Sequence, residues 1–254
     1  MPDCWAMHAV SQHLIMDADD TLWEDALYFE QAIEEFLDLL DRGTLSRQQV
    51  RSILDEIELA NSGLHPFGSR TFADNLGECY RRVAEPARLL GQPAGSGKAS
   101  AASGAVDPDE LAHVKELGKR LLHQPRQLIP GVSETLQYLA PRHHLILYTK
   151  GHPAEQSLKV KSSGLAIFFR HIEIAHEKNA ATYSELAARL GLDRARTWMI
   201  GNSPKSDINP ALEAGLNAVY IPHAQTWRLE HEEISPGPGR LLVLERFSEL
   251  RQHF

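Results

Sequence analysis

The 254-residue chain lacks the features of disulfide-rich, zinc-binding and membrane-spanning proteins. Its two cysteines, Cys4 and Cys79, stand far apart and form no CxxC pair, so neither a disulfide framework nor a zinc site is expected. No apolar run approaches the roughly 18 residues that a membrane-spanning helix needs. Met1 to Met16 have neither the basic start nor the continuous apolar stretch of a signal peptide. These absences predict a cytoplasmic protein without a membrane span.

Runs of basic residues are absent as well, and the formal net charge is −8. This balance argues against nucleic acid or an anionic membrane as a partner. A small anionic substrate would then require a local cation. With 43% hydrophobic residues, the chain can form one large domain or two smaller domains with a sizeable core.

The most informative feature that is present is a pair of aspartates at the end of a short apolar run. Residues 13–17 have the pattern of a buried strand that ends in Asp17, and Asp19 lies two residues further on. In an open α/β sheet, the carboxyl ends of the strands form the edge that binds ligands. Two carboxylates this close repel each other unless a cation neutralises one of them or a proton resides on the other. The pair therefore indicates a metal site.

Residues 26–125 show helical rather than strand periodicity, which predicts an insertion of four helices after the first strand. A glycine stop, a capping box, a proline stop and an N-cap aspartate mark the expected helix ends, at Gly43, Ser46 with Gln49, Pro86 and Asp107. The predicted domains are an α/β core of residues 1–24 and 128–254 and a helical insertion of residues 25–127.

Within this insertion, the segment at about 91–105 is dominated by Gly, Ala, Ser and Pro, which predicts a flexible surface loop. Residues 95–99 superficially resemble a phosphate-binding loop. The spacing from Gly91 is one residue too long, Ala99 replaces the metal-binding hydroxyl, and no predicted strand precedes the segment. We therefore interpret it as a linker.

After Gly131, helical and strand patterns alternate, which predicts parallel strands joined by right-handed crossovers in a layered α/β sheet. The expected elements are a helix at 132–140, strands at 144–149 and 171–175, a helix at 180–190, a strand at 197–201, a helix at 208–215 and a strand at 218–221. The first strand must join this sheet.

Four segments, in chain order, resemble the motifs of the haloacid dehalogenase-like superfamily, whose members are mostly phosphatases. They are Asp17-Ala18-Asp19-Asp20-Thr21, Leu145 to Gly151, Lys178 before a helix, and Gly201 to Asp207. Each follows a predicted strand, and the resemblance covers essentially the whole chain. It implies a Rossmann-like parallel sheet core with an inserted α-helical cap of the C1 type.

The resemblance implies that Asp17 is the nucleophile that attacks phosphorus and forms an aspartyl-phosphate. Asp19 would protonate the departing alkoxide and later deprotonate the attacking water, which requires it to hold a proton part of the time. Mg²⁺ would bind an Asp17 oxygen, the Asp19 backbone carbonyl and oxygens of Asn202 and Asp207. Hydrolytic dehalogenases of the same superfamily lack the second aspartate, so Asp19 favours phosphate chemistry.

In the same reading, Thr149 would hydrogen-bond a phosphoryl oxygen, together with backbone N–H groups of Lys150 and Gly151. Lys178 would place a positive charge beside the transferring group. The alternatives are a capping hydroxyl for Thr149 and a solvated lysine at a helix start for Lys178. Three other lysines compete for the role of Lys178, namely Lys150, Lys159 and Lys161.

Asn202 departs from the superfamily pattern, which commonly has an acidic residue after the glycine of the last motif. Asparagine offers an oxygen but no charge. Mg²⁺ would therefore be held by Asn202 directly, or mainly by Asp207 and water, and more weakly in either case. The alternative role for Asp207 is that of a helix N-cap.

Substrate choice is assigned to the cap, because the core motifs handle only the phosphoryl group. The loop of residues 65–70 ends at Arg70, which would pair with a second anion of the substrate. The alternative is an ordinary turn with an exposed arginine. Trp227 and Arg228, near the C-terminal end, are further candidates for approach to the site.

These patterns predict a Mg²⁺-dependent phosphatase that acts on a small phosphorylated metabolite. A phosphomutase or phosphonatase with the same nucleophile is the alternative within enzymes. Outside enzymes, the alternative is a binding or regulatory protein that keeps the fold but turns over negligibly, which the neutral Asn202 would explain.

Overall fold

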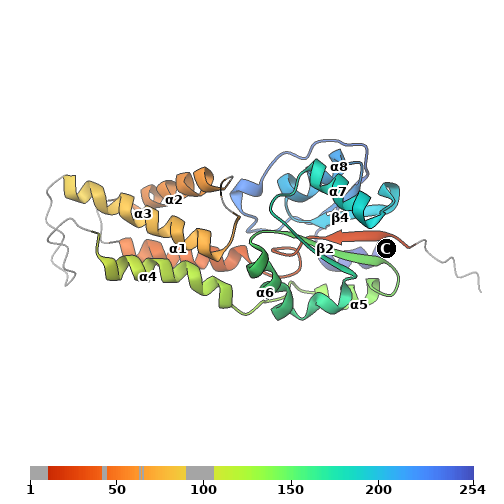
Figure 1. Ribbon diagram of the computed structural model, residues 1–254, viewed down its shortest axis with the longest axis horizontal. Helices are drawn as coiled ribbons and strands as arrows, with labels where there is room; N and C mark the ends of the chain where they lie inside the picture. The colour runs from red at the N-terminus through yellow and green to blue at the C-terminus, as the bar shows by residue number, and fades with distance from the viewer. Residues whose placement is uncertain (1–10, 42–44, 63, 65, 90–105) are drawn as a thin grey trace, which may run out of the picture. The chain divides into compact units, whose positions relative to one another are not determined.

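The computed structural model describes residues 11–41, 45–62, 64, 66–89 and 106–254 (Figure 1). The expected helix stop at Gly43 and the loop expected at about 91–105 lie outside the described residues. The chain divides into two compact units, one of Met1–Glu24 with Arg126–Phe254 and one of Asp25–Pro125. The sequence-based division placed the second boundary two residues further along the chain.

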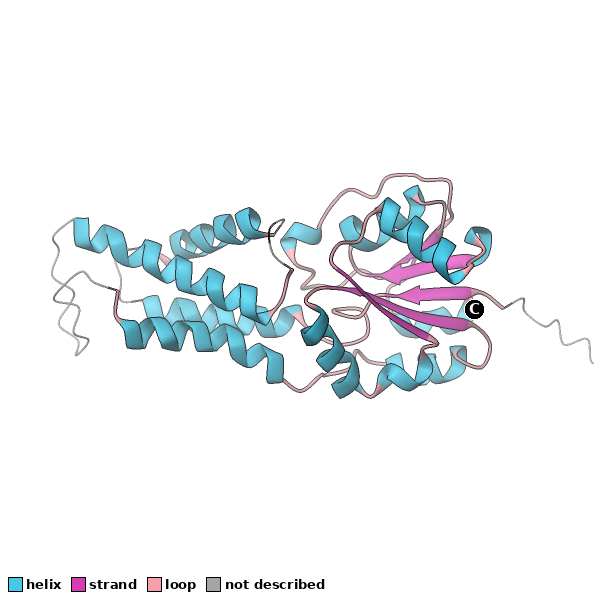
Figure 2. Ribbon diagram, viewed as in Figure 1, coloured by secondary structure: helices cyan, strands magenta, loops and turns pink. Residues whose placement is uncertain are grey.

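The first unit contains a sheet of six parallel strands in the order β3-β2-β1-β4-β5-β6 (Figure 2). The strands are β1 (His13–Met16), β2 (His144–Lys150), β3 (His171–Ala175), β4 (Thr197–Gly201), β5 (Asn217–Tyr220) and β6 (Leu241–Val243). β1 lies between β2 and β4, with Met16 opposite Leu147 and Ile200. The predicted α/β fold with a Rossmann-like parallel sheet is confirmed. The edge strand β6 was not predicted, because three residues are too few for a strand pattern.

Helices cover both faces of this sheet (Figure 1): α5 (Val132–Leu139), α6 (Pro153–Ser163), α7 (Ala180–Leu190) and α8 (Asn209–Glu213). Successive side chains of a strand point to opposite faces. Leu14 and Met16 therefore pack in one apolar cluster with residues of α5 and α6, whereas Ile15 packs in another with residues of α7 and α8. Burial on both faces explains the continuous apolar run of β1.

Two connections differ from the sequence-based expectation. Helix α6 was not predicted, because its apolar residues do not form a clear stripe. The helix expected at 208–215 begins earlier, as a π-helical turn at Pro204–Ile208 that continues into α8. The backbone N–H of Ile208 donates to the carbonyl of Ser203, five residues back, at 3.1 Å, which is the hydrogen bond of a π-helix. Pro210, in the following turn, has no backbone N–H to donate. The described part of the chain also has five short 3₁₀ turns, at Arg120–His123, Leu165–Phe168, Arg194–Arg196, Arg228–Glu230 and Phe247–Gln252.

The second unit consists of α1 (Ala26–Leu40), α2 (Arg47–Asn61), α3 (Ser69–Leu89) and α4 (Pro108–Lys119). Ser46 and Gln49 form the expected capping box of α2, and Asp107 caps α4. The expectation that Pro86 ends α3 is wrong, since the helix runs to Leu89. Pro86 lies within the last turn of α3. Its missing backbone N–H removes one helical hydrogen bond, and few helical residues follow it.

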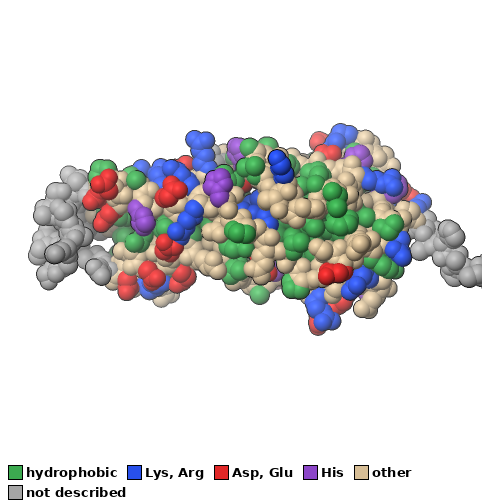
Figure 3. Space-filling view, turned by 90° about the horizontal axis from the view of Figure 1, so that it is seen from below, with side chains coloured by type: hydrophobic (Ala, Val, Ile, Leu, Met, Phe, Trp, Pro, Cys, Tyr) green, Lys and Arg blue, Asp and Glu red, His purple; other side chains and the backbone are tan. Residues whose placement is uncertain are grey.

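The helical unit is held by an apolar core that includes Phe29, Phe36, Leu54, Phe72 and Leu117. Charged side chains of both signs are interspersed on the face that Figure 3 shows. Exposed ion pairs such as Arg47–Glu34 at 2.7 Å contribute little to stability, so core packing is the main source of it. None of the helices in the described ranges is long and apolar enough to cross a membrane.

Candidate active site

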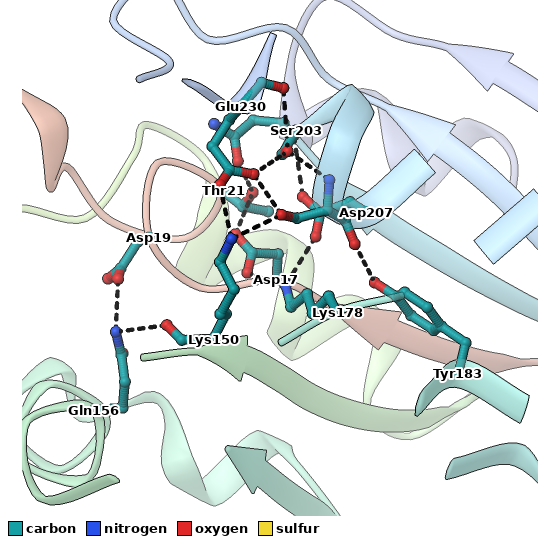
Figure 4. Close-up of polar contacts among 12 residues, drawn as sticks. Asp17, Asp19, Thr21, Lys150, Gln156, Lys178, Tyr183, Ser203, Asp207 and Glu230 are labelled. Atoms are coloured by element: carbon teal, nitrogen blue, oxygen red, sulfur yellow. Dashed lines mark hydrogen bonds and ion pairs between the residues drawn. The ribbon is translucent and has the colours of Figure 1, made fainter. Parts of the chain in front are cut away.

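The carboxyl ends of β1, β2 and β4 bring three of the sequence motifs to one edge of the sheet (Figure 4). Asp17 directly follows β1, and its backbone N–H donates to the Ile200 carbonyl at 2.9 Å. Thr149 is the penultimate residue of β2, and Asn202 directly follows β4. All three side chains are buried.

Lys178 joins the first and last motifs through a buried ammonium group. Its Nζ donates to Asp17 Oδ1 at 2.5 Å and to Asp207 Oδ1 at 2.8 Å. Lys178 stands immediately before Asn179, the N-cap of α7, and this helix start places it at the strand edge. The exposed fraction of the Lys178 side chain is 2%, so the alternative of a solvated lysine is wrong.

Asp207 is held by the π-helical turn that follows β4. The backbone N–H of Ser203 donates to Asp207 Oδ2 at 3.0 Å, while Oδ1 accepts from Lys178. Glycine is required at position 201, because a Cβ there would lie 2.2 Å from Asp207 Oδ2. The N-cap of the turn is Ser203, whose hydroxyl accepts from the Ser206 N–H, so Asp207 is not a helix N-cap.

The charges of these three residues do not balance. Burial raises the pKa of Asp17 to about 7, because the negative Asp207 adds to the desolvation and Lys178 only partly opposes it. Burial alone would lower the pKa of Lys178, but Asp17 and Asp207 raise it above its usual value. Two carboxylates therefore share one ammonium, and an excess negative charge is buried here whenever Asp17 is ionised.

The raised pKa of Asp17 makes stability depend on pH. Since the folded chain holds this proton more tightly than the unfolded chain, its stabilising effect is present at low pH and is lost as the pH rises through about 7. In metal-free buffer, we expect the free energy of unfolding of Asp17→Asn to rise relative to that of wild type as the pH is raised from about 5 to about 8. Urea titrations at both pH values test this, and equal pH dependence of the two proteins would contradict it.

Asp19 is held apart from Asp17 by its own partners (Figure 4). Its carboxylate accepts from Trp23 Nε1 at 2.7 Å, Gln156 Nε2 at 2.8 Å and Lys159 Nζ at 2.9 Å. Burial would raise the pKa of Asp19, but the Lys159 ammonium and these hydrogen bonds lower it below its usual value. In this arrangement Asp19 is ionised, although the predicted acid role requires a proton.

Asn202 is fixed at both ends of its amide. Thr21 Oγ1 lies 3.2 Å from Asn202 Oδ1 and 3.3 Å from Asp17 Oδ2, so its hydroxyl connects the first and last motifs. At the other end, Asn202 Nδ2 donates to Thr226 Oγ1 at 3.0 Å. The amide oxygen is thereby turned toward Thr21 and the nitrogen toward Thr226.

Glu230 is a site residue that sequence reasoning missed. Its carboxylate accepts from Lys150 Nζ at 2.7 Å, Ser203 Oγ at 2.6 Å and Ser206 Oγ at 2.5 Å. Burial would raise the pKa of Glu230, but the Lys150 ammonium and the serine hydroxyls lower it. The sequence-based candidates in this segment were Trp227 and Arg228, whereas no local pattern distinguishes Glu230.

Replacing this carboxylate should weaken the fold around the last motif. Glu230→Gln keeps the size of the side chain but leaves the half-buried Lys150 ammonium without an opposite charge. We expect a loss of about 1.5–3 kcal/mol in the free energy of unfolding, the range for hydrogen bonds to charged groups. Urea unfolding measures the loss, and Glu232→Gln at an exposed position of the same segment is the control. Equal stability of the two variants would contradict the prediction.

The remaining predicted residues have separate surroundings. Lys159 pairs with Asp19 and Lys161 is exposed on α6, so Lys178 is the lysine that contacts Asp17. The backbone N–H of Gly151 donates to the Ala175 carbonyl at 3.0 Å, so it is not available to bind a phosphoryl group here. Arg70 is exposed in the first turn of α3, within the helical unit.

The oxygen atoms at this edge fit a hard divalent cation. Asp17 and Asp207 supply carboxylates and Asn202 supplies an amide oxygen, which are ligand types that Mg²⁺ accepts. The excess negative charge of the two carboxylates over Lys178 would be neutralised by such an ion. Asp20 of the first motif forms a further group of potential metal ligands with Glu24 and His223, whose ligand atoms lie within 4.8 Å of one another.

Residues 12–215 match the model of a hydrolase family, the haloacid dehalogenase-like hydrolases. A haloacid dehalogenase-like family hydrolase from Xanthomonas campestris is similar in structure, with a TM-score of 0.74 and 27% identity over 96% of this chain and 90% of that chain. No curated protein matches the chain.

Two more distant structures carry different activities in their names. A 2-haloacid dehalogenase from Pseudomonas syringae has a TM-score of 0.53 and 22% identity, over 96% of this chain and 97% of that chain. A predicted phosphoglycolate phosphatase from Haemophilus somnus has a TM-score of 0.55 and 16% identity, over the same shares of the two chains. At these identities the likeness establishes the fold alone, and the fold accommodates both chemistries.

Proposed function

The chain belongs to the haloacid dehalogenase-like hydrolase family, and from this premise we propose that it is a Mg²⁺-dependent phosphatase acting on a small phosphorylated metabolite. The observation that supports the proposal most is the buried group of Asp17, Lys178 and Asp207 at the carboxyl edge of the sheet. A nucleophilic carboxylate, a fixed cation and a second carboxylate are the groups that phosphoryl transfer through an aspartyl-phosphate requires.

In the proposed reaction, an Asp17 carboxylate oxygen attacks the phosphorus of the ester. A new oxygen–phosphorus bond forms at Asp17, and the bond between phosphorus and the ester oxygen breaks. The leaving alkoxide takes a proton, which releases an alcohol. Water then attacks the aspartyl-phosphate, so that inorganic phosphate leaves and the Asp17 carboxylate is restored.

We assign the proton transfers to Asp19. Its ionised state in contact with Lys159 suits the second half of the reaction, in which a base must take a proton from water. The first half requires a protonated acid, and the contact with Lys159 opposes protonation. Asp19 must therefore leave Lys159 when an ester occupies the site, which a rotation of its side chain would achieve.

Two further side chains act on the phosphoryl group itself. The Lys178 ammonium would stabilise the charge on the transferring phosphoryl oxygens, and the Thr149 hydroxyl would hydrogen-bond one of them. Mg²⁺ would be held by oxygens of Asp17, Asp207 and Asn202 with the Asp19 carbonyl, and when bound it reduces the repulsion between carboxylate and phosphate. We also propose the helical unit as a cap that selects the substrate, with Arg70 as a partner for a second anion.

A substrate panel tests this function against its alternatives. Purified protein is incubated with p-nitrophenyl phosphate, sugar phosphates, bisphosphorylated sugars, phosphonoacetaldehyde and 2-chloropropionate, with Mg²⁺ or with a chelator. Mg²⁺-dependent release of phosphate from monoesters supports the proposal. Chloride release would identify a dehalogenase, and conversion of the bisphosphorylated sugar or the phosphonate would identify a mutase or a phosphonatase. Absence of turnover on every compound would favour a binding or regulatory protein.

The role of Asp19 predicts the effect of a conservative substitution. Asp19→Asn should slow turnover by roughly 10²–10⁴-fold, the usual range for general acid–base help. It should keep the Mg²⁺-dependent rise in melting temperature, because only the backbone carbonyl of Asp19 is proposed as a ligand. Steady-state kinetics and thermal melts measure the two effects. Unchanged turnover would remove Asp19 from the mechanism.

A further inference from the structure

Asn202 differs from a carboxylate in one respect that matters for a cation. A carboxylate presents oxygen whichever way it turns, whereas an amide presents oxygen on one side and an NH₂ group on the other. Asn202 can serve as a ligand only if its oxygen faces Asp17. The surroundings of its amide must therefore distinguish the two orientations.

Thr226 makes this distinction through the single proton of its hydroxyl. Thr226 Oγ1 donates to the backbone carbonyl of His223 at 3.0 Å, and a carbonyl oxygen can only accept. The hydroxyl oxygen is then left as an acceptor, 3.0 Å from Asn202 Nδ2. In the reversed orientation, two oxygen atoms without a proton between them would face each other. As long as the hydroxyl proton stays on the His223 carbonyl, Thr226 favours the NH₂ group of Asn202 on its own side.

The opposite end of the amide is the end that faces the proposed nucleophile. With the nitrogen on Thr226, Asn202 Oδ1 lies 3.2 Å from Thr21 Oγ1, which is itself 3.3 Å from Asp17 Oδ2. Thr21, Asn202 and Thr226 are all buried, so water does not replace these contacts freely.

Thr226 itself is fixed by the segment between β5 and the turn at Arg228–Glu230. Its backbone N–H donates to the His223 carbonyl at 3.1 Å, and its own carbonyl accepts from His231 Nε2 at 3.0 Å. His223 is tied in turn to Glu24, with Nε2 3.2 Å from the carboxylate. The hydroxyl of Thr226 is thus presented to Asn202 by a segment that is anchored on both sides.

We propose that Thr226 is a positioning residue that holds the Asn202 amide with its oxygen toward Asp17, so that Asn202 is a direct ligand of the divalent cation. The inference rests on the proposed function for the presence of that cation. It assigns Asn202 a direct contact with the ion, whereas the sequence left open a site formed mainly by Asp207 and water.

The test is the affinity of the full chain for Mg²⁺ in the absence of substrate, measured by calorimetry and by the Mg²⁺-dependent shift in melting temperature. Thr226→Val keeps the shape of the side chain and removes the hydroxyl, and we expect Mg²⁺ affinity to fall by about 10- to 100-fold, the usual cost of losing a group that orients a ligand. Thr226→Ser keeps the hydroxyl and should bind Mg²⁺ like wild type. Thr226→Ala is the replacement if the valine variant does not fold.

The combination with Asn202→Asp separates positioning from a merely structural role. A carboxylate at 202 presents oxygen in either orientation, so adding Thr226→Val to Asn202→Asp should leave Mg²⁺ affinity unchanged. An equal loss in both backgrounds would overturn the proposal, as would wild-type affinity in the Thr226→Val single variant. If wild type itself binds no Mg²⁺, the proposed function fails together with the inference. If wild type binds Mg²⁺ and Thr226→Val binds equally well, only the inference fails.

Discussion

Asp17→Asn should abolish phosphate release, with a loss of roughly 10⁴-fold or more, as is typical for removal of a nucleophile. An amide oxygen cannot form the aspartyl-phosphate, so the reaction loses its two-step path. The asparagine oxygen can still accept a hydrogen bond from Lys178, which donates to Asp17 at 2.5 Å in the wild type. We therefore expect the variant to be folded and inactive. Phosphate release in the presence of Mg²⁺ measures the effect.

The control for this experiment is Asp109→Asn, which changes an exposed aspartate of the helical unit by the same chemical group. Its turnover should equal that of wild type. Rapid-quench experiments with ³²P-labelled ester provide a second measurement, since label should become attached to wild-type protein and to the control but not to Asp17→Asn. Substantial turnover or labelling of Asp17→Asn would exclude Asp17 as the nucleophile.

Lys178→Met should produce a larger loss of stability than Glu230→Gln. Methionine fills similar space, but it leaves the buried carboxylates of Asp17 and Asp207 facing each other without the ammonium that bridges them. Removing one partner of a buried ion pair costs roughly 3–5 kcal/mol of unfolding free energy. Turnover should also be lost, since no cation remains beside the transferring phosphoryl group. Urea unfolding and phosphate release measure the two effects.

Mg²⁺ gives this prediction a second part. The ion would restore positive charge between the same two carboxylates, so it should raise the melting temperature of Lys178→Met more than that of wild type. Lys161→Met, at an exposed position of α6, is the matched control and should leave stability and turnover unchanged. A Lys178→Met protein as stable as this control in metal-free buffer would contradict the central position of Lys178 in the buried charge network.

The capping residues and apolar patterns allowed most of the fold to be predicted. The strand at 171–175, the helix at 180–190 and the strand at 197–201 have the predicted bounds, because each has its own local pattern. The helix is in addition followed by the C-cap Gly191, and the second strand ends at Gly201. Helix α6 and strand β6 were missed because one has no clear apolar stripe and the other has three residues. Pro86 was misread because a proline near the end of a helix removes little of it.

By itself, the sequence determined the α/β class, the strand that carries Asp17 and Asp19, and the order of the motifs, since all of these depend on residues that are close in the chain. Only the tertiary structure decided which lysine each carboxylate meets. It placed Lys178 on Asp17 and Asp207, and it placed Lys159 on Asp19. It also brought Glu230 and Thr226 from the C-terminal segment to the last motif. These partners are far apart in the chain, so no local spacing encodes their pairing. Strand order decides which segments meet at the edge of the sheet, and burial leaves each charged or amide group there with few groups in reach.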